Sequence, residues 1–277
     1  MSDRTYVFID GEYLRHRHRE EMSRFFGVEG ELELSPIMQQ TKATRVYFYD
    51  AVDYAQRVGE DGAAWEKRVL VREQFLASVA ALNGFLVRPG SVRRGKKREQ
   101  KEVDVLLAVD MMEHVLNGSM SKAILIAGDV DFRPVVEALV RHGVTVHVWY
   151  HSGSFAQELP GAADFGHEIK FRQLHSWNTE AFKKMHRVPY EESRAGDSWG
   201  ELVKIGSLYP RYSSRVALYK LPPGAAKPDK FFLWINVEQW EKLMVSDTDL
   251  DLIERYVATQ YAPIQWEADE IVVTAGG

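Results

Sequence analysis

The chain has 277 residues, 45% of them hydrophobic, which is enough for one large domain or two unequal ones. It contains no cysteine, so disulfide bonds, thiolate zinc sites and a cysteine nucleophile are excluded. The lack of cysteine also suits a reducing compartment, and we expect a cytoplasmic protein. There is neither a basic leader before an apolar stretch nor a run of about twenty apolar residues. We therefore expect neither secretion nor membrane insertion.

The formal net charge of −5 is spread unevenly along the chain, because residues 88–101 carry seven basic side chains and one acidic side chain. A basic patch on an acidic protein attracts phosphate locally, while the net charge suppresses indiscriminate binding. A solvated charged loop would explain the same run. The candidate nucleic-acid contacts in this segment are Arg93, Arg94, Lys96, Lys97, Arg98 and Lys101.

Short apolar runs alternate with amphipathic segments over the first half of the chain. The runs predict buried strands at Tyr6–Ile9, Val46–Tyr49, Phe85–Val87, Ala123–Ala127 and Val144–Trp149. The intervening segments predict helices at Ala63–Leu82, Val103–Leu116 and Phe132–His142. A last helix and an edge segment are expected within Phe155–Phe165 and Glu168–Phe171. Strands that alternate with helices predict an α/β fold, with a parallel sheet covered on both faces.

The pattern changes near residue 188, which we take as the end of a first domain, 1–188. Residues 189–200 are polar, contain proline and glycine and lack periodicity, so they are expected to form a linker. Residues 201–277 are expected to form a smaller α+β unit. Its predicted strands are Arg215–Leu221, Phe231–Asn236 and Glu270–Thr274. Helices are predicted in this unit at Val237–Met244 and Leu250–Gln260, and a short helix is predicted before the linker at Ala181–Arg187.

Aspartates follow two of the predicted strands. Asp10 comes directly after Tyr6–Ile9, and Asp129 and Asp131 follow Ala123–Ala127. Because ligands of open α/β sheets bind outside the carboxyl ends of the strands, we expect these three side chains to share one rim. Carboxylates that lie so close together need protonation or a divalent cation. A set of oxygen ligands without cysteine favours Mg²⁺ or Mn²⁺ over zinc.

Simpler explanations exist for single members of this set. An aspartate after a strand can bond to its own turn or cap the next helix, but capping explains only one of Asp129 and Asp131. Asp104 lies in the first turn of a predicted helix, where the helix dipole stabilises a carboxylate with or without metal. Asp110 lies about 120° around that helix from Asp104. We therefore interpret Asp110 as a supporting or structural carboxylate.

A carboxylate cluster of this kind suits phosphodiester hydrolysis assisted by one or two metal ions. The serines and the nine histidines show no spacing typical of a catalytic triad or a zinc site, and the P-loop pattern is absent. We place His16 and His18 on a solvated basic face. Three tyrosines near the rim either stack on bases or belong to the core. They are Tyr13, Tyr47 and Tyr49.

Together these motifs resemble the NYN domain family, the LabA-like branch of the PIN-like metal-dependent ribonucleases. The resemblance runs from about Tyr6 to Leu174. Its motifs are Val7–Leu14, Lys101–Asp110 and the most specific one, Ile124–Val136, with Ser154–Asp164 similar to the closing helix. It implies a PIN-like three-layer sheet, an RNA substrate and a Mg²⁺ or Mn²⁺ pocket. The acidic pocket would consist of Asp10, Asp104, Asp129 and Asp131.

The sequence departs from the family at Tyr13, where the family usually has an asparagine that helps to order the pocket, and Glu12 is placed to compensate in part. The first hypothesis is therefore a metal-dependent endoribonuclease whose C-terminal unit selects the substrate, binds a protein partner or forms a homodimer. The second is a catalytically weak or inactive RNA-binding or regulatory protein, which Tyr13 favours. A haloacid-dehalogenase-like phosphatase would need an aspartate at position 12.

Overall fold

The computed structural model describes residues 4–90, 99–153, 157–193, 201–208, 217–224, 230–236, 242–261 and 263–273. The basic segment 93–98 lies outside the described residues, and the described part of Lys101 is its backbone. The chain divides into two compact units, residues 1–183 and 184–277. No helix in the described ranges is long and apolar enough to cross a membrane.

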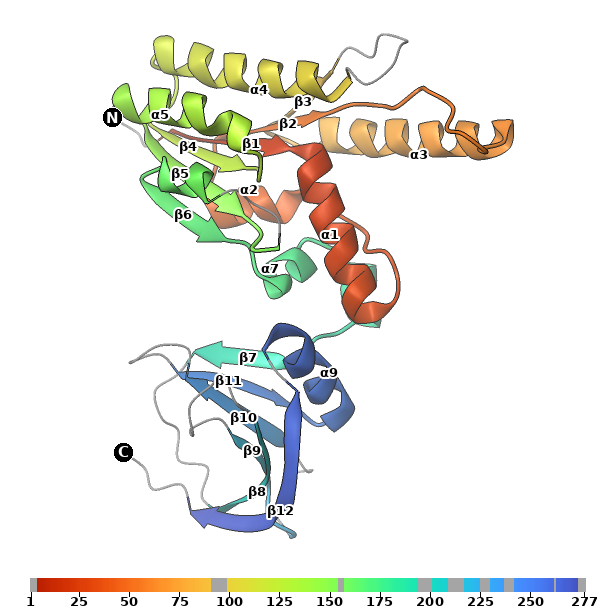
Figure 1. Ribbon diagram of the computed structural model, residues 1–277, viewed down its shortest axis with the longest axis vertical. Helices are drawn as coiled ribbons and strands as arrows, with labels where there is room; N and C mark the ends of the chain where they lie inside the picture. Colours follow the sequence, from red (N-terminus) through yellow and green to blue (C-terminus); the bar gives the residue numbers. More distant parts are fainter. Residues whose placement is uncertain are drawn as a thin grey trace. The chain divides into compact units, whose positions relative to one another are not determined.

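The first unit is built on one six-stranded sheet, in which every neighbouring pair of strands is parallel (Figure 1). Its strands are β1 (Thr5–Asp10), β2 (Arg45–Asp50), β3 (Phe85–Pro89), β4 (Lys122–Ile126), β5 (Thr145–Tyr150) and β6 (Phe165–Glu168). Their spatial order is β3-β2-β1-β4-β5-β6. This order places the ends of β2, β1 and β4 next to one another, and the predicted α/β parallel sheet is confirmed.

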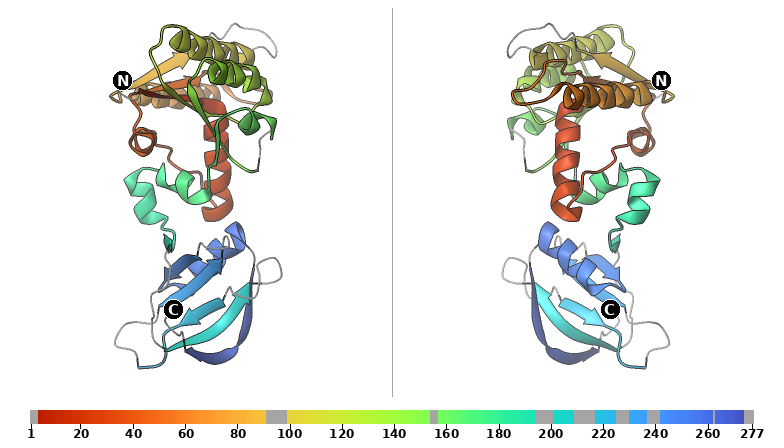
Figure 2. Two further views of the ribbon diagram at one scale, coloured as in Figure 1. Left: turned by 90° about the vertical axis from the view of Figure 1, so that its left-hand side faces the viewer. Right: turned by 90° about the vertical axis from the view of Figure 1, so that its right-hand side faces the viewer.

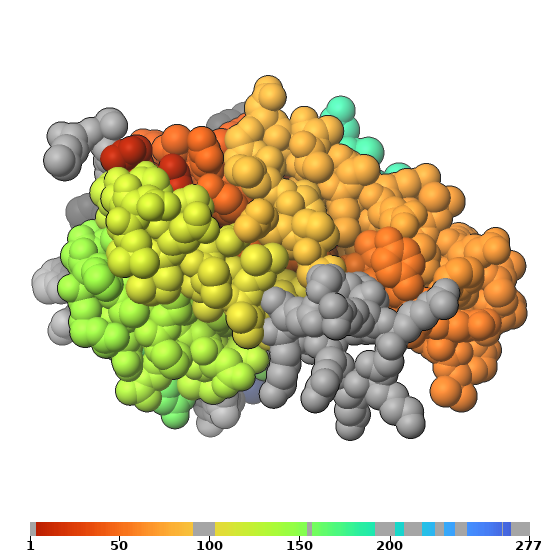
Figure 3. All heavy atoms as spheres, turned by 90° about the horizontal axis from the view of Figure 1, so that it is seen from above, coloured from red at the N-terminus to blue at the C-terminus, as the bar shows by residue number. Residues whose placement is uncertain are grey.

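Helices cover both faces of this sheet (Figures 1 and 2). One face carries α1 (Gly11–Phe26), α2 (Ser35–Thr41), α3 (Gly62–Ala80) and α7 (Phe171–Ser176). The other face carries α4 (Glu99–Leu116), α5 (Arg133–Arg141) and the short α6 (Glu158–Gly161). In Figure 3 the surface of α4 lies between that of α3 and that of α5. A three-layer α/β arrangement results, as predicted.

The core of this unit consists of strand side chains that alternate between the two helical layers. Phe8 and Tyr47 stack with their ring centroids 5.3 Å apart, and they belong to one cluster with Leu107 and Met111 of α4. Tyr47 is 4% exposed and Tyr49 is fully buried. Both tyrosines are therefore core residues and are not available to stack on bases.

The first unit differs from the predictions in three respects. Helix α1 was not predicted, because charged residues separate its buried Leu14, Met22 and Phe25. His18 is 2% exposed, and burial lowers its pKa to about 4, so it is not part of a solvated basic face. The edge strand β6 begins at Phe165, three residues before the expected segment.

The second unit contains a six-stranded sheet with antiparallel pairing throughout and the order β12-β8-β9-β10-β11-β7. Its strands are β7 (Tyr190–Ser193), β8 (Glu201–Leu208), β9 (Ala217–Lys220), β10 (Phe231–Asn236), β11 (Lys242–Asp247) and β12 (Ile264–Val273). Helix α8 (Glu180–Met185) precedes β7, and α9 (Leu250–Gln260) contacts β11 and β12.

Two predictions for this unit differ from the structure. Residues 190–193, expected in a linker, form β7 and pair with β11. Residues 242–244, expected to end a helix that begins at Val237, belong to β11, and residues 237–241 lie outside the described residues. Periodicity alone does not separate a buried strand from a buried helix in an apolar run as short as Leu243–Val245.

The junction between β1 and α1 depends on a close approach at Gly11. A Cβ atom at this position would lie 2.7 Å from the Tyr49 carbonyl oxygen and 2.9 Å from Cβ of Asp50. We expect Gly11→Ala to lower the free energy of unfolding by about 1–3 kcal/mol, because the contact is with the β2 backbone. Chemical denaturation measures the change.

Gly62→Ala is the matched control, because Gly62 also begins a helix and a Cβ atom there meets no atom within 4 Å. This variant should be neutral or slightly stabilising. Equal destabilisation by both substitutions would contradict the role assigned to the close packing at Gly11.

Candidate active site

Asp10 is the last residue of β1 and the N-cap of α1. Its Oδ1 accepts a hydrogen bond from the Tyr13 backbone N–H at 3.0 Å. Burial raises the pKa of Asp10 to about 7, and repulsion from the carboxylates of Asp104, Glu12 and Asp50 adds to the shift. Asp10 is thus a helix cap, which agrees with the simpler explanation. The contributions of other acids to its raised pKa show that it also lies near them.

These acids line a cavity of about 80 Å³ at the carboxyl ends of β1 and β2. Its lining residues are Asp10, Glu12, Tyr49, Asp50, Ala51, Asp53, Val103 and Asp104. The structure therefore brings together three of the predicted site residues with two acids that the sequence analysis missed. We call this space the acidic cavity.

Asp104 reaches the acidic cavity from α4, on the opposite helical layer from α1. Burial raises its pKa to about 6, and repulsion from Asp129, Asp131 and Glu12 contributes. Its shift therefore links the acidic cavity to the two aspartates that follow β4.

Asp129 and Asp131 are exposed and do not line the acidic cavity. Asp129 is the N-cap of the short helix η1 (Val130–Phe132), and its Oδ1 accepts from the Asp131 N–H at 2.9 Å. Capping therefore accounts for Asp129, whereas no cap explains Asp131. Both remain within electrostatic reach of Asp104.

The donor atoms around the acidic cavity are carboxylate oxygens, which are the ligands that Mg²⁺ and Mn²⁺ prefer. Across the described residues, no three His, Asp or Glu side chains are grouped closely enough to hold one ion. Magnesium usually takes only one or two carboxylates and completes its shell with water and substrate phosphates. The donor chemistry thus fits such an ion, but a shell shared by all four predicted aspartates is not present.

Asp50 ends β2, and its 2%-exposed carboxylate joins α1 to α3. Arg15 of α1 donates to both of its oxygens, at 2.8 and 2.9 Å, and Arg72 of α3 lies 3.5 Å from Oδ2. The sequence carried a signal for Asp50, because it follows the run Val46–Tyr49 just as Asp10 follows its own strand. Asp53, three residues later, lies 3.3 Å from Arg68 and 3.7 Å from Arg57.

Tyr13, at the position where asparagine is usual, connects α1 to the end of β5. Its hydroxyl oxygen accepts a hydrogen bond from the backbone N–H of His151 at 2.8 Å. Burial raises the pKa of Tyr13, so the phenol stays neutral. This side chain fixes the chain at the rim in a way that a shorter asparagine would not.

Asp110 has the supporting role that its helical position predicts. It is 4% exposed, forms two hydrogen bonds with Arg88 at 2.7 and 2.8 Å, and accepts from the Tyr49 hydroxyl at 2.9 Å. Tyr49 lines the acidic cavity. Asp110 therefore acts on the cavity only by holding one of its walls.

The raised pKa of Asp10 makes stability depend on pH. The folded chain binds more protons than the unfolded chain between about pH 4 and pH 7, so the free energy of unfolding falls as pH rises through this range. We expect Asp10→Asn, measured with chelator, to raise the melting temperature by on the order of 5 °C at pH 8 and to have little effect near pH 4.

Asp61→Asn provides the control. Asp61 caps α3 through a bond from the Ala64 N–H at 2.7 Å, but it is exposed. The same chemical change there should give no pH-dependent gain in thermal unfolding. A gain from Asp10→Asn that is identical at pH 4 and pH 8 would show that ionisation of the Asp10 carboxyl is not its cause.

The comparisons with known proteins bear on this arrangement. The sequence profile of the NYN domain matches residues 4–170. A comparison with curated proteins found no match. The crystal structure of a Vibrio parahaemolyticus protein of unknown function is similar at 17% identity over 61% of this chain and 93% of that chain, with a TM-score of 0.41. Because the NYN profile covers more than half of the chain, the chain belongs to the NYN domain family.

Proposed function

We propose that the protein is a metal-dependent endoribonuclease that hydrolyses RNA phosphodiester bonds at the acidic cavity. NYN domains belong to the PIN-like nuclease superfamily, whose members typically use divalent metals. The proposal is supported by Asp10 at the end of β1 and Asp104 on α4, two partly buried acids that line one cavity and whose pKa values are raised. Acids kept together at such a cost in a cleft are typical of functional sites.

In this proposal Asp10 and Asp104 hold Mg²⁺ or Mn²⁺, and Asp129 and Asp131 add negative charge beside Asp104. A bound ion of this kind lowers the pKa of a water molecule and neutralises charge on the phosphate oxygens. Glu12, which lines the acidic cavity, is placed to accept a proton from water. Tyr49 and Val103 bound the cavity and limit its access to solvent.

Two further parts of the proposal rest on the sequence. The basic residues of segment 93–98 and Lys101 precede Asp104 in the chain, and we assign them contacts with RNA phosphates. The second unit, residues 184–277, is assigned a role in choosing the substrate or a protein partner, including a second copy of the chain. Membership of the LabA-like branch also remains an expectation.

The alternative is a catalytically weak or inactive NYN-type protein that binds RNA and regulates. The observation that favours it is Tyr13, whose hydroxyl bonds to the His151 backbone instead of providing an amide beside Asp10. On this reading the acidic cavity is kept for ligand sensing. Retained RNA binding without cleavage separates it from the first proposal.

Cleavage assays test the proposed activity. We expect the protein with Mn²⁺ or Mg²⁺ to cut a mixed pool of single-stranded and structured RNA, and expect chelator to stop it. Asp104→Asn and Asp129→Asn should each lower the rate at least about 100-fold, because each removes charge that positions the ion. Asp61→Asn should cut normally. Unchanged cleavage by Asp104→Asn would remove the acidic cavity from the mechanism.

Metal binding provides a test that does not depend on cleavage. A metal ion needs deprotonated ligands, so Mn²⁺ should bind more weakly below the pKa values of about 6 and 7. At a hundredfold excess over its dissociation constant, Mn²⁺ should stabilise the protein by about 2.7 kcal/mol. Thermal unfolding at fixed Mn²⁺ should show a larger gain at pH 8 than at pH 5, and Asp104→Asn should lose most of it. An equal gain at both pH values would contradict the assignment.

A further inference from the structure

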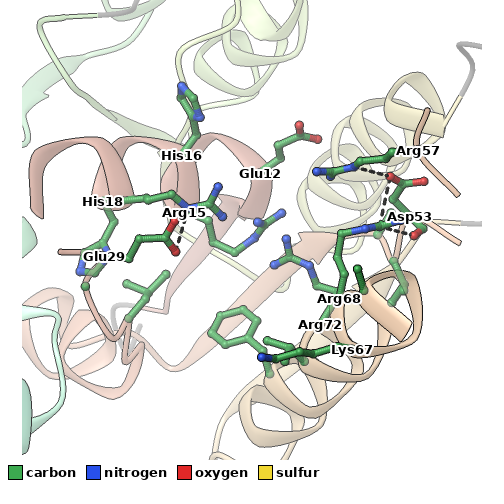
Figure 4. Close-up of a pocket in the computed structure, with 18 residues that line it drawn as sticks. Glu12, Arg15, His16, His18, Glu29, Asp53, Arg57, Lys67, Arg68 and Arg72 are labelled. Atoms are coloured by element: carbon green, nitrogen blue, oxygen red, sulfur yellow. Dashed lines mark hydrogen bonds and ion pairs between the residues drawn. The ribbon is translucent and has the colours of Figure 1, made fainter. Parts of the chain in front are cut away.

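A second, larger cavity of about 930 Å³ lies between α1 and α3. Figure 4 shows side chains from these two helices on its two sides, with Arg15 and Glu12 on α1 and Lys67 and Arg72 on α3. Further lining residues come from segments 29–32 and 51–57. We call this space the α1–α3 groove.

The α1–α3 groove is basic although the protein is acidic. Its lining includes three acids, Glu12, Glu29 and Asp53. It includes twice as many permanent cations, and two histidines lie beside them. The cations are Arg15, Arg19, Arg57, Lys67, Arg68 and Arg72. A concave surface lined by one sign of charge concentrates ions of the opposite sign.

Two of these cations, Arg15 and Arg19, repel a third, Arg72. Burial lowers the pKa of Arg72, and the charges of Arg15 and Arg19 lower it further, while Asp50 opposes the shift. Asp50 also fixes the directions of Arg15 and Arg72 through the contacts described above. An anion between the helices would relieve this repulsion and would meet guanidinium groups already held in place.

Two of the cations, Arg19 and Arg57, have exposed acidic partners, whereas Arg68 pairs at 2.7 Å with Glu60, whose side chain is 12% exposed. Arg19 lies 3.6 Å from Glu29, and both side chains are more than half exposed. Arg57 lies 3.7 Å from Asp53, again with both partners solvent-accessible. Exposed ion pairs of this kind contribute little stability, so these cations can exchange a carboxylate for a phosphate at low cost.

The α1–α3 groove and the acidic cavity adjoin each other. Glu12, Ala51 and Asp53 line both spaces. A polyanion seated along the cations would therefore reach the carboxylates where we place the reaction. The cations of the groove would hold the phosphates of such a polyanion. A metal ion between phosphate and carboxylates would be needed only at the acidic cavity.

The lining also indicates how a strand would be recognised. Phe75 is the one Phe, Tyr or Trp side chain among the residues that line it, and its ring packs edge-on against the core residue Phe48 with centroids 5.9 Å apart. Base-stacking platforms that bind single strands use exposed aromatic faces. Contacts in the groove would therefore be made mainly with phosphates and would tolerate many sequences.

From these observations we infer that the α1–α3 groove binds the phosphate backbone of an RNA strand on one side of the cleaved bond, largely without regard to sequence. This inference rests on the proposed nuclease function and adds the path of the substrate to it. It assigns Arg15, Arg19, Lys67 and Arg72 to phosphate contacts, none of which the sequence analysis singled out.

The test removes two cations that do not touch Asp50. Arg19→Gln with Lys67→Gln leaves the buried pair between Arg15 and Asp50 intact, and both positions are exposed. Binding of a fluorescent mixed-sequence RNA 12-mer is measured in the full chain carrying Asp104→Asn, over a range of salt concentrations. Each lost contact should reduce the salt slope by about 0.7, so the double variant should bind about 25-fold more weakly at 0.1 M salt.

Arg45→Gln with Lys122→Gln is the matched control. It removes the same charge at the amino ends of β2 and β4, whereas the proposed site lies at the carboxyl ends of the strands. It should leave affinity and slope within about twofold of the parent. Equal weakening by both double variants would overturn the inference, since it would show a general charge effect. Competition by a mononucleotide as effective as that by the 12-mer would also overturn it, because the groove would then be a small-ligand pocket.

Cleavage by the chain with Asp104 restored separates the two proposals. If the groove variant loses RNA affinity while no form of the protein cuts RNA, the groove is supported and the nuclease fails. If RNA is cut and the groove variant binds and cuts like the control, the nuclease stands and the groove is wrong.

Discussion

Burial of neighbouring carboxyl groups at the carboxyl ends of β1 and β2 determines the electrostatics of the site. Asp10 ends β1 and Asp104 comes from α4, both are partly withdrawn from water, and burial together with repulsion between carboxylates raises their pKa values to about 7 and about 6. Such a cluster lowers the stability of the folded chain near neutral pH unless a cation compensates. The fold supplies two arginines for Asp50 but no ion pair for Asp10 or Asp104 among the described side chains. A divalent cation would fill this role.

Asp50 connects this acidic region to the basic one. Its carboxylate belongs to the acidic cavity, while its partners Arg15 and Arg72 line the α1–α3 groove. The buried Asp50 thus lies at the boundary between the acidic cavity and the basic groove. Phosphodiester chemistry needs this arrangement, because the backbone must be attracted while the reacting phosphate is held beside carboxylates that would repel it without an ion.

The sequence predicted the parts of the molecule that depend on continuous apolar runs. The five strands from Tyr6 to Trp149 were found because buried parallel strands are hydrophobic on both faces. Asp10 was placed at the rim on the same grounds. The groove was not predicted, because it depends on α1, whose apolar positions are separated by charged ones. It also depends on the pairing of Asp50 with Arg15, 35 positions before it, and with Arg72, 22 positions after it. Spacing along the chain carries no signal for such contacts.

An anomalous diffraction map from crystals grown at pH 8 with Mn²⁺ would locate the metal. We expect a manganese peak in the acidic cavity, coordinated by Asp10 or Asp104, and no such peak in crystals of Asp104→Asn. Manganese found only at other surface carboxylates of the wild-type protein would contradict the metal site proposed here. The raised pKa values would then reflect burial alone, and the cavity would not be the metal site of a nuclease.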